Sequence, residues 1–400
     1  MLRKGEDEVE MNRAFRYELP TAIVFGNGAA GGLADHVRQL RGSKVLLVSD
    51  PGVLKAGLAE RLTAVLESAS IPYIVYSDIE PEPDIEGVMR GRDAARENGC
   101  DCVVGVGGGS ALDTAKAIGL MLNNEGHIRD YVGIGKVPRK GAPVIAMPTT
   151  AGTGSELTIW SVLSDKRHRV KLSVGSPYNC PDMALCDPEL TLTLPGPVTA
   201  ATGMDALTHA LESYVNKATQ PISEGMSLQA MKLVARSLRT AVLQGDRLQA
   251  RYDMLMASLL AAMAFHATRL GLAHALAIPL GARFGIPHGV VNAILLPEVM
   301  QFNLPGSLEK FAEIARLFGM PTEGRSPREA AAQAVIAVRQ LKEDIGIRQT
   351  LSDFGVTEAD LDGIAAEALL SGNIPVNPVQ PSADDLKAIC RSAMRREREA

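Results

Sequence analysis

The stretch CVVGVGGGSALDTAK, residues 102–116, joins a short apolar run to a helical pattern through three consecutive glycines. Gly107, Gly108 and Gly109 permit a tight turn and a close approach of the backbone. The first N–H groups of the following helix, with Ser110 as its cap, favour an anionic group. The pattern predicts a pyrophosphate-binding loop, although a merely tight turn would use the same glycines. It is not the ordinary G-x-G-x-x-G fingerprint, because Ser110 stands where that motif has glycine.

The segments around this loop alternate between strand and helix patterns. The strand patterns are residues 44–49, 73–76, 102–106 and 144–147, and the helical patterns between them include residues 54–69 and 85–98. Such alternation predicts an α/β domain with a doubly wound parallel sheet.

The pattern changes after LTLPGP, residues 192–197, where long helical periodicities replace the strand signal. A chain of 400 residues is also long for one core. We therefore expect an α/β nucleotide-binding domain over residues 1–195 and an all-α domain over residues 196–400.

Composition excludes several classes of protein. The formal net charge is -5, with mixed signs, and gives no reason to expect nucleic acid or a membrane surface. No apolar run is long enough to span a bilayer, and MLRKGEDEVEMNRAF at the start has no apolar core of a signal peptide. The five cysteines form no C-x-x-C pair. A cytoplasmic protein with a small-molecule ligand fits best.

Four potential metal ligands lie in the second half. Asp205 and His209, in GMDALTHALESYV, are four residues apart and share one face of a helix. His274 lies in GLAHALAIPLG and His288 in GIPHGVVNAILLP. One carboxylate and three imidazoles can hold a divalent transition metal and leave a position for a substrate oxygen. Each residue alone would more often be an ordinary buried polar group.

Two further polar features end predicted strands. Asp50 follows the strand KVLLVS, where a carboxylate can accept hydrogen bonds from ribose hydroxyls and repel a 2′-phosphate. That favours NAD over NADP, although Asp50 could equally cap the following turn. Residues 148–156, PTTAGTGSE, follow another strand, and their hydroxyls suit contacts with adenine, ribose or nicotinamide.

Several motifs together resemble the iron-containing (group III) alcohol dehydrogenases. They are GGGSALDTAK, MPTTAGTGSE, SPYNCPDMALCDPELTLTLP, ATGMDALTHALESYV and GIPHGVVNAILLP, in the family's order from about residue 15 to the C-terminus. The resemblance implies a dehydroquinate synthase-like architecture, with an NAD(P)-binding α/β domain, a helical metal-binding domain and an active site between them. It also implies a homodimer that interconverts alcohols with aldehydes or ketones, transferring hydride between the metal-held substrate and the nicotinamide.

The resemblance assigns roles to individual residues. It implies Asp205, His209, His274 and His288 as ligands of Fe²⁺, although ligand chemistry alone also allows Zn²⁺, Mn²⁺, Co²⁺ or Ni²⁺. The implied cofactor-binding residues are Asp50, Gly107, Gly108, Gly109, Ser110, Asp113, Thr149, Thr150, Thr153 and Lys171. Lys171 is expected near the nicotinamide ribose and in the catalytic set.

The chain departs from the resemblance at Ile278, where many relatives carry a second histidine that passes the substrate proton outward. His266, eight residues before His274, is the candidate replacement, with a satisfied core histidine as the alternative. Arg269 would pair with an acidic substrate if it points into the cleft, and would be a solvated charge if it points out. Trp160 either narrows the substrate pocket or packs between the domains.

Three other functions remain open at this point. The metal-independent maleylacetate reductases resemble this family but lack the full ligand set. A dehydroquinate synthase-like lyase would need a site crowded with basic residues, and only Lys171 and Arg269 are candidates. A non-catalytic nucleotide-binding protein would bind NADH without turnover.

Overall fold

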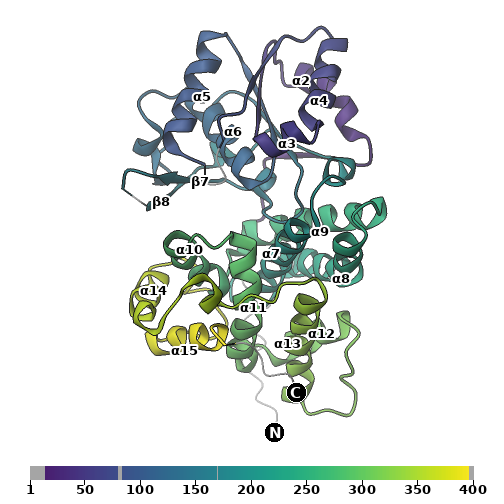
Figure 1. The fold of residues 1–400 in the computed structure, drawn as a ribbon, viewed down its shortest axis with the longest axis vertical. Coiled ribbons are helices and arrows are strands. Elements are labelled where there is room, and N and C mark those ends of the chain that lie inside the picture. The colour runs from purple at the N-terminus through teal and green to yellow at the C-terminus, as the bar shows by residue number, and fades with distance from the viewer. Residues whose placement is uncertain (1–13, 80–82, 169, 396–400) are drawn as a thin grey trace.

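The computed structural model describes residues 14–79, 83–168 and 170–395. Two parts are stacked along the long axis, an α/β part that carries the first half of the chain and a helical part that carries the second (Figure 1). Residues 1–13, on which the expectation of no signal peptide depends, lie outside the described residues.

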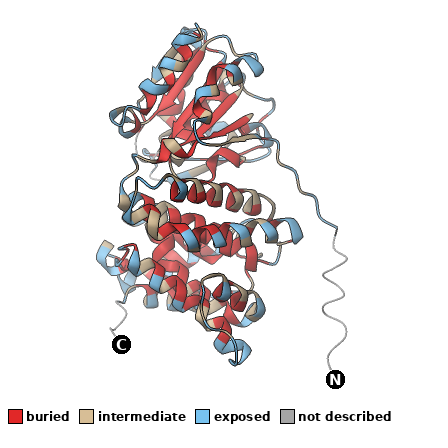
Figure 2. Cartoon of the chain, turned by 90° about the vertical axis from the view of Figure 1, so that its right-hand side faces the viewer, coloured by how far each residue is buried: buried red, intermediate tan, exposed pale blue. Residues whose placement is uncertain are grey.

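The α/β part is built on a parallel sheet of six strands. Its strands, in spatial order, are β1 (Ala22–Phe25), β9 (Met183–Cys186), β6 (Val144–Pro148), β4 (Cys102–Gly107), β2 (Val45–Ser49) and β3 (Tyr73–Tyr76). Every pairing is parallel. The four inner strands, β9, β6, β4 and β2, are buried along their whole length and are therefore continuous apolar runs rather than alternating ones, and Figure 2 shows strands as the buried centre of this part.

Helices cover both faces of the sheet. Val45 and Leu47 of β2 pack with α2 (Leu33–Gln39) and α4 (Leu58–Ser68). Leu46 and Val48 face the other way, toward α5 (Ile85–Glu97) and α6 (Gly109–Leu122). The predicted doubly wound α/β class is therefore confirmed. The chain runs outward from β2 to β3 and then returns to β4, so the carboxyl ends of β2 and β4 flank the point where strand order reverses, the usual ligand site of such sheets.

Two local expectations differ from the structure. The single helix expected over residues 54–69 is two helices, α3 (Pro51–Lys55) and α4, because Gly57 between them has a left-handed φ of 74°. A second sheet was not expected. It contains β5 (Gly133–Ile134) and a hairpin of β7 (Trp160–Asp165) and β8 (Val170–Gly175), whose exposed and buried residues alternate on β7.

The described residues after β9 contain no strand, as expected. The first five helices of this part are α7 (Gly196–Val215), α8 (Pro221–Leu243), α9 (Leu248–Thr268), α10 (Leu272–Phe284) and α11 (His288–Asn303). Four more complete this part: α12 (Leu308–Leu317), α13 (Pro327–Asp344), α14 (Leu361–Leu369) and α15 (Ala383–Ala393). Ala, Leu and Met of α7, α8 and α9 form the largest core.

Helices α9 and α10 are separated by a sharp bend. Their axes differ by 102°, and Arg269 at the bend has a φ of 65° and a ψ of -166°. In the part of the chain that the structure describes, no single helix has the length and apolarity to cross a membrane, and only this bent pair passes that test when taken together. The bend brings the start of α10 against α7.

Candidate functional site

Helix α7 presents three acidic or imidazole side chains on one face. Asp205, His209 and Glu212 are four and three residues apart, so their side chains lie above one another on the helix. All three are buried. The surrounding sequence, ATGMDALTHALESYV, is rich in good helix formers, and α7 therefore places these groups on a rigid element.

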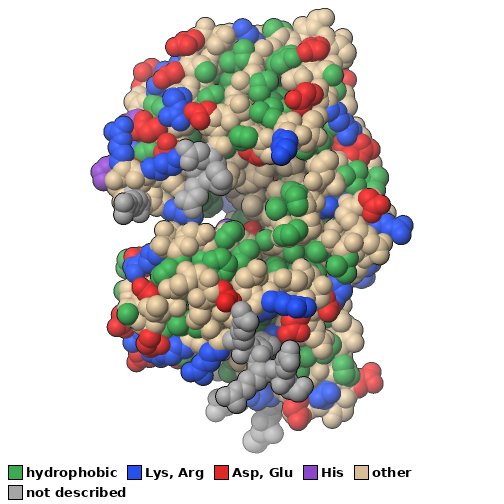
Figure 3. Space-filling view, viewed as in Figure 1, with side chains coloured by type: hydrophobic (Ala, Val, Ile, Leu, Met, Phe, Trp, Pro, Cys, Tyr) green, Lys and Arg blue, Asp and Glu red, His purple; other side chains and the backbone are tan. Residues whose placement is uncertain are grey.

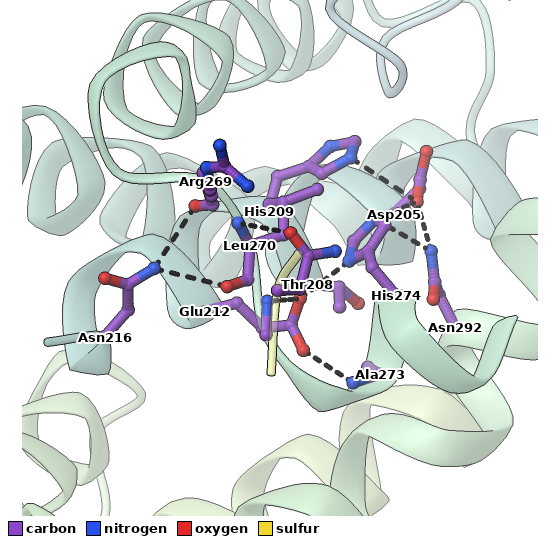
Figure 4. A network of polar contacts seen from close by, with 12 residues as sticks. Asp205, Thr208, His209, Glu212, Asn216, Arg269, Leu270, Ala273, His274 and Asn292 are labelled. Carbon is purple, nitrogen blue, oxygen red and sulfur yellow. Dashed lines mark hydrogen bonds and ion pairs between the residues drawn. The ribbon is translucent and has the colours of Figure 1, made fainter. Parts of the chain in front are cut away.

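The other two imidazoles come from separate helices. His274 lies in the first turn of α10, which the bend turns toward α7, and His288 is the first residue of α11. One ligand atom from each of Asp205, His209, His274 and His288 lies within 4.8 Å of the others. From Asp205 Oδ1, the Nε2 atoms of His209 and His274 lie 3.9 and 3.7 Å away (Figure 4). The Nε2 atom of His288 lies 3.7 Å from the same oxygen.

The donor set fits a divalent metal. Four ligands about 2.1 Å from a shared tetrahedral ion would be about 3.4 Å apart, close to the spacing found here. Three imidazoles and one carboxylate are ligands that suit iron, zinc, cobalt, nickel or manganese. The set does not decide among these metals.

Neighbouring groups orient two of the imidazoles. His209 Nδ1 donates to the carbonyl of Gly152, at 3.0 Å, and His274 Nδ1 donates to Glu212, at 2.7 Å. With these protons on Nδ1, the Nε2 atoms face the cluster, as is usual for metal-ligating histidines. Glu212 also accepts hydrogen bonds from the main-chain N–H groups of Gly271 and Ala273, at 2.9 and 2.7 Å (Figure 4).

The electrostatics keep the cluster ready for a cation. Burial lowers the pKa of His209 to about 3, so this imidazole is neutral at neutral pH. Desolvation beside the cluster also lowers the pKa of His288, although its side chain is 49% exposed. Burial alone would raise the pKa of Asp205, but His209, His288 and His274 lower it below its usual range. Burial would lower the pKa of His274 as well, but the charge of Glu212 raises it to about 9, so metal binding at Nε2 must displace a proton.

Sequence reasoning missed Glu212 and Asn292. Asn292 is fully buried on α11, and its Nδ2 lies 2.7 Å from Asp205 Oδ1, 3.1 Å from His274 Nε2 and 3.2 Å from His288 Nε2. Both residues carried a signal in the sequence. Glu212 follows His209 by three residues, and Asn292 follows His288 by four, which are the spacings of one helix face.

The glycine-rich loop lies against the threonine-rich loop. Gly107 and Pro148 are paired at the ends of β4 and β6, and Thr149 N–H donates to the Gly107 carbonyl at 3.0 Å. A Cβ on Gly108 would lie 3.3 Å from Thr150 Cγ2, and one on Gly109 would lie 3.0 Å from Thr153 Cγ2. Ser110, Thr150 and Thr153 are partly exposed beside this loop, whereas Thr149 is buried.

Asp50 lies at the same edge of the sheet. Its Oδ1 accepts from Gly52 N and Val53 N, at 2.8 and 3.0 Å, and caps α3. Its Oδ2 faces the glycine loop, because a Cβ on Gly107 would lie 2.8 Å from it. Asp50 therefore caps the helix, as the alternative interpretation held, while its second oxygen faces the loop where a coenzyme is expected.

Asp113 makes contacts with the protein itself. Its oxygens accept from Ser155 Oγ, at 2.5 Å, and from Val162 N, at 2.9 Å, and Lys116 Nζ lies 3.0 Å away. Lys116 is buried and also donates to the carbonyls of Ser155 and Trp160. These contacts join α6 to the threonine-rich loop and to β7, and they favour a positioning role for Asp113 over a direct coenzyme contact.

The remaining candidates lie around the space between the two parts, which Figure 3 shows as an indentation in the surface. Lys171 on β8 reaches toward α10, where a Cβ on Gly281 would lie 3.9 Å from its Nζ, and its charge contributes to lowering the pKa of His288. Trp160 is 37% exposed, and its ring covers Gly175 on the neighbouring strand.

Two candidates do not join the cluster. Burial lowers the pKa of His266, and main-chain groups of Glu18 and Leu157 act in the opposite direction, which favours the satisfied core histidine. Arg269 is exposed, and its Nη1 donates to the Gly372 carbonyl at 3.3 Å. That contact favours the outward-pointing interpretation. Ile278, where relatives carry histidine, is 50% exposed.

A parallel doubly wound sheet, a phosphate-type loop and an Asp-His₃ cluster on helices together describe a metal-dependent dehydrogenase of nucleotide-linked type. Comparison with known proteins agrees. The description "Iron-containing alcohol dehydrogenase" matches residues 20–188, and "Fe-containing alcohol dehydrogenase family, C-terminal" matches residues 199–394.

Individual relatives cover nearly the whole chain. It is 42% identical to 1,3-propanediol dehydrogenase of Citrobacter freundii over 95% of this chain and 99% of that protein. The crystal structure of a 1,3-propanediol oxidoreductase superposes with a TM-score of 0.93, at 42% identity over 95% of this chain and 100% of that one. The NAD⁺ complex of sulfoacetaldehyde reductase from Bifidobacterium kashiwanohense superposes with a TM-score of 0.87, at 33% identity over 96% and 99% of the two chains.

The chain therefore belongs to the iron-containing alcohol dehydrogenases. It is an oxidoreductase that acts on alcohols and the corresponding carbonyl compounds, as the resemblance implied.

Proposed function

We propose that the chain is an NAD(H)-linked dehydrogenase in which Asp205, His209, His274 and His288 hold one divalent metal, with Fe²⁺ as the family expectation. The observation that carries this proposal is the meeting of the four ligand atoms within 4.8 Å, on three separate helices. The orientation of His209 and His274 by Gly152 and Glu212 supports it, because these contacts leave the Nε2 lone pairs for the metal.

A metal held there would supply Lewis-acid polarisation of the substrate oxygen, and NAD would supply the hydride acceptor. The chain's own residues then position the reactants. The glycine loop and Thr150 and Thr153 would hold the pyrophosphate, and Asp50 the adenosine ribose. Lys171, reaching from β8 toward α10, would fix the nicotinamide ribose beside His288. Thr149 and Asp113 would hold these loops in position through their contacts with the protein, without touching the coenzyme.

The exit of the substrate proton takes a different route from that of relatives with a second histidine. Ile278 has no group to carry a proton, and His266 is bound to main chain elsewhere. We propose that the proton leaves through the coenzyme ribose hydroxyls and water. The His266→Ala variant tests this. An unchanged pH profile of turnover is expected, and an altered profile would return His266 to the mechanism.

The substrate we propose is a small alcohol or its aldehyde. The relatives named for 1,3-propanediol and sulfoacetaldehyde support small substrates, and Trp160 would narrow the pocket. The test is oxidation of NADH, followed at 340 nm, over small aldehydes, ketones and oxoacids with and without added Fe²⁺. We expect Fe²⁺-dependent turnover with a small aldehyde. Turnover that persists after chelation would favour the metal-independent maleylacetate reductase type, and NADH binding without turnover would favour a binding protein.

Replacement of one proposed ligand tests whether turnover depends on metal bound at this cluster. The Asp205→Asn variant keeps the size of the side chain and removes its charge, so we expect turnover to fall by more than about 100-fold, beyond the usual effect of an outer contact. The metal content, measured by elemental analysis, should fall in parallel. A variant with full activity and no metal would contradict the assignment.

Coenzyme preference is tested at Asp50 with two variants. Asn is a good helix cap without a charge, so Asp50→Asn should keep stability and narrow the preference for NADH over NADPH. Asp50→Ala should narrow the preference equally but lose the cap, at a cost of about 1 kcal/mol. If the ratio of kcat/KM for NADH to that for NADPH is unchanged in both variants, Asp50 does not determine the coenzyme preference and serves only to cap α3.

Three further expectations remain proposals. They are a homodimer, a cytoplasmic location, and a domain boundary at residues 195–196. Light scattering after size-exclusion chromatography tests the dimer, and a mass of 42.5 kDa would show a monomer instead.

A further inference from the structure

Asn292 lies beside the ligand cluster with its amide nitrogen toward the ligands. The nitrogen is within hydrogen-bonding distance of one carboxylate oxygen and two imidazole nitrogens, at 2.7, 3.1 and 3.2 Å. These are the same Asp205, His274 and His288 atoms that would bind a metal. The amide has two hydrogens, so it can serve two of the three acceptors at once.

The other end of the same side chain bears on which way the amide faces. Asn292 Oδ1 is buried and has no hydrogen-bond partner. A buried unpartnered carbonyl costs free energy. If the amide were turned around, this oxygen would face the Asp205 carboxylate and the lone pair of the neutral His288 imidazole, both of which are acceptors. The acceptors of the cluster therefore fix the orientation of the amide.

A metal and the amide hydrogens need the same lone pairs. A neutral imidazole has one lone pair in its ring plane at Nε2, and it either accepts a hydrogen bond or binds a metal. A carboxylate oxygen has two, so Asp205 Oδ1 can bind a metal and still accept from Asn292. When a metal is bound, Asn292 therefore keeps its contact with Asp205 and loses its contact with an imidazole.

We propose that Asn292 is a positioning residue that holds the four ligands together when no metal is bound and competes with the metal for the imidazoles, so that it sets the metal affinity. The inference rests on the proposed metal site. It assigns to α11 a second role besides carrying His288. One residue would then tune how tightly the enzyme keeps its metal without being a ligand.

The test measures the affinity for Zn²⁺, which is not sensitive to air, by competition with a chelating dye. Asn292→Ala removes two hydrogen bonds from the metal-free protein and one from the loaded protein. We therefore expect Zn²⁺ to bind about tenfold more tightly, the value of one hydrogen bond to a strong acceptor. The melting temperature of the metal-free variant should fall, and the rise on adding Zn²⁺ should be larger than in the wild type.

A second variant and a matched control exclude general damage. Asn292→Leu keeps the volume of the side chain and should show the same gain in affinity if Asn292→Ala packs poorly. Asn303→Ala removes another buried asparagine from α11, one that exchanges hydrogen bonds of 3.1 and 2.7 Å with Asn377. It should lower the melting temperature of both forms equally and leave the Zn²⁺ affinity unchanged.

The outcomes separate the two proposals. If the wild type does not bind Zn²⁺, the metal site is wrong, and this inference falls with it. If the wild type binds Zn²⁺ and the Asn292 variants bind it equally or more weakly, the metal site stands. Competition is then wrong, and Asn292 would instead hold Asp205 in place for the metal.

Discussion

The metal cluster and the glycine-rich loop differ in which part of the chain forms the site: side chains form the cluster, and the backbone forms the loop. The cluster depends on side chains, of which Asp205, His209 and His274 are buried and His288 is exposed, and it is held by further side chains such as Glu212 and Asn292. The loop depends on the backbone, because Gly107, Gly108 and Gly109 leave room that a single Cβ would fill. Substitutions that remove side-chain groups should therefore damage the metal cluster, and substitutions that add a Cβ should damage the glycine-rich loop.

Among changes outside the four ligands, the largest effect is expected at Glu212, the outer contact of the cluster. Glu212→Gln cannot accept from His274, Gly271 and Ala273 in the same way, so His274 would lose its orientation. We expect the affinity for Zn²⁺ to fall by about 10- to 100-fold in dye competition. Asp253→Asn is the control, since this buried acid bonds Arg236 and Ser237 away from the cluster. Equal losses in both variants would show general destabilisation.

The matching change in the loop is Gly107→Ala. Its Cβ would lie 2.6 Å from Ala111 Cβ, and the φ of 151° is strained for any residue with a Cβ. We expect NADH, titrated by its fluorescence, to bind about tenfold more weakly, with Zn²⁺ affinity unchanged. Gly31→Ala, where a Cβ meets nothing within 4 Å, should change neither. Loss of Zn²⁺ binding in Gly107→Ala would mean that the two sites are not separable.

A smaller effect is expected at Glu156, between the two sites. Burial raises the pKa of this carboxyl to about 7, although Lys116 opposes the shift. The folded protein therefore holds a proton that the unfolded chain releases above its ordinary pKa of 4.5, so this group's contribution to stability falls from pH 4.5 to pH 7. Glu156→Gln should melt a few degrees higher than the wild type at pH 8 and show little gain at pH 4.5. An equal gain at both pH values would contradict the shift.

The smallest effect is expected at Arg269. Its φ of 65° and ψ of -166° lie in a region that suits glycine. Arg269→Gly should therefore stabilise the protein by about 1 kcal/mol, while Arg269→Ala should leave its melting temperature nearly unchanged. Because the side chain points to Gly372, neither variant should lose activity with acidic substrates more than with neutral ones. A selective loss would place Arg269 in the substrate pocket.

The sequence predicted what depends on local pattern. Strand runs around Leu47, Val104 and Ile145 are apolar enough to be recognised, and the four-residue spacing of Asp205 and His209 is a property of one helix. The sequence could not show which segments meet. The contact of His209 with Gly152, and those of Asn292 with three ligands, arise from packing between residues up to 87 positions apart.

Other features could not be decided from the sequence, because two patterns compete there. The first four residues of β7 alternate between exposed and buried, but the hairpin of β7 and β8 lies between strong parallel-strand signals. Asp113 carries a motif that predicts coenzyme contact, and yet its oxygens bond Ser155 and Val162. His266 has the right helical spacing to His274, but the bend between α9 and α10 breaks that periodicity.

The hydrogen bond between Gly152 and His209 has a consequence for engineering. It crosses from the threonine-rich loop to the metal-bearing helix, and a Cβ at Gly152 would lie only 2.7 Å from Thr202 on the same helix. A chimera that takes its first half from one relative and its second half from another would therefore combine a threonine-rich loop and a helix α7 whose contacting residues come from different proteins. Such a graft should exchange residues 148–156 together with α7, as one unit, to keep both ligand and loop in place.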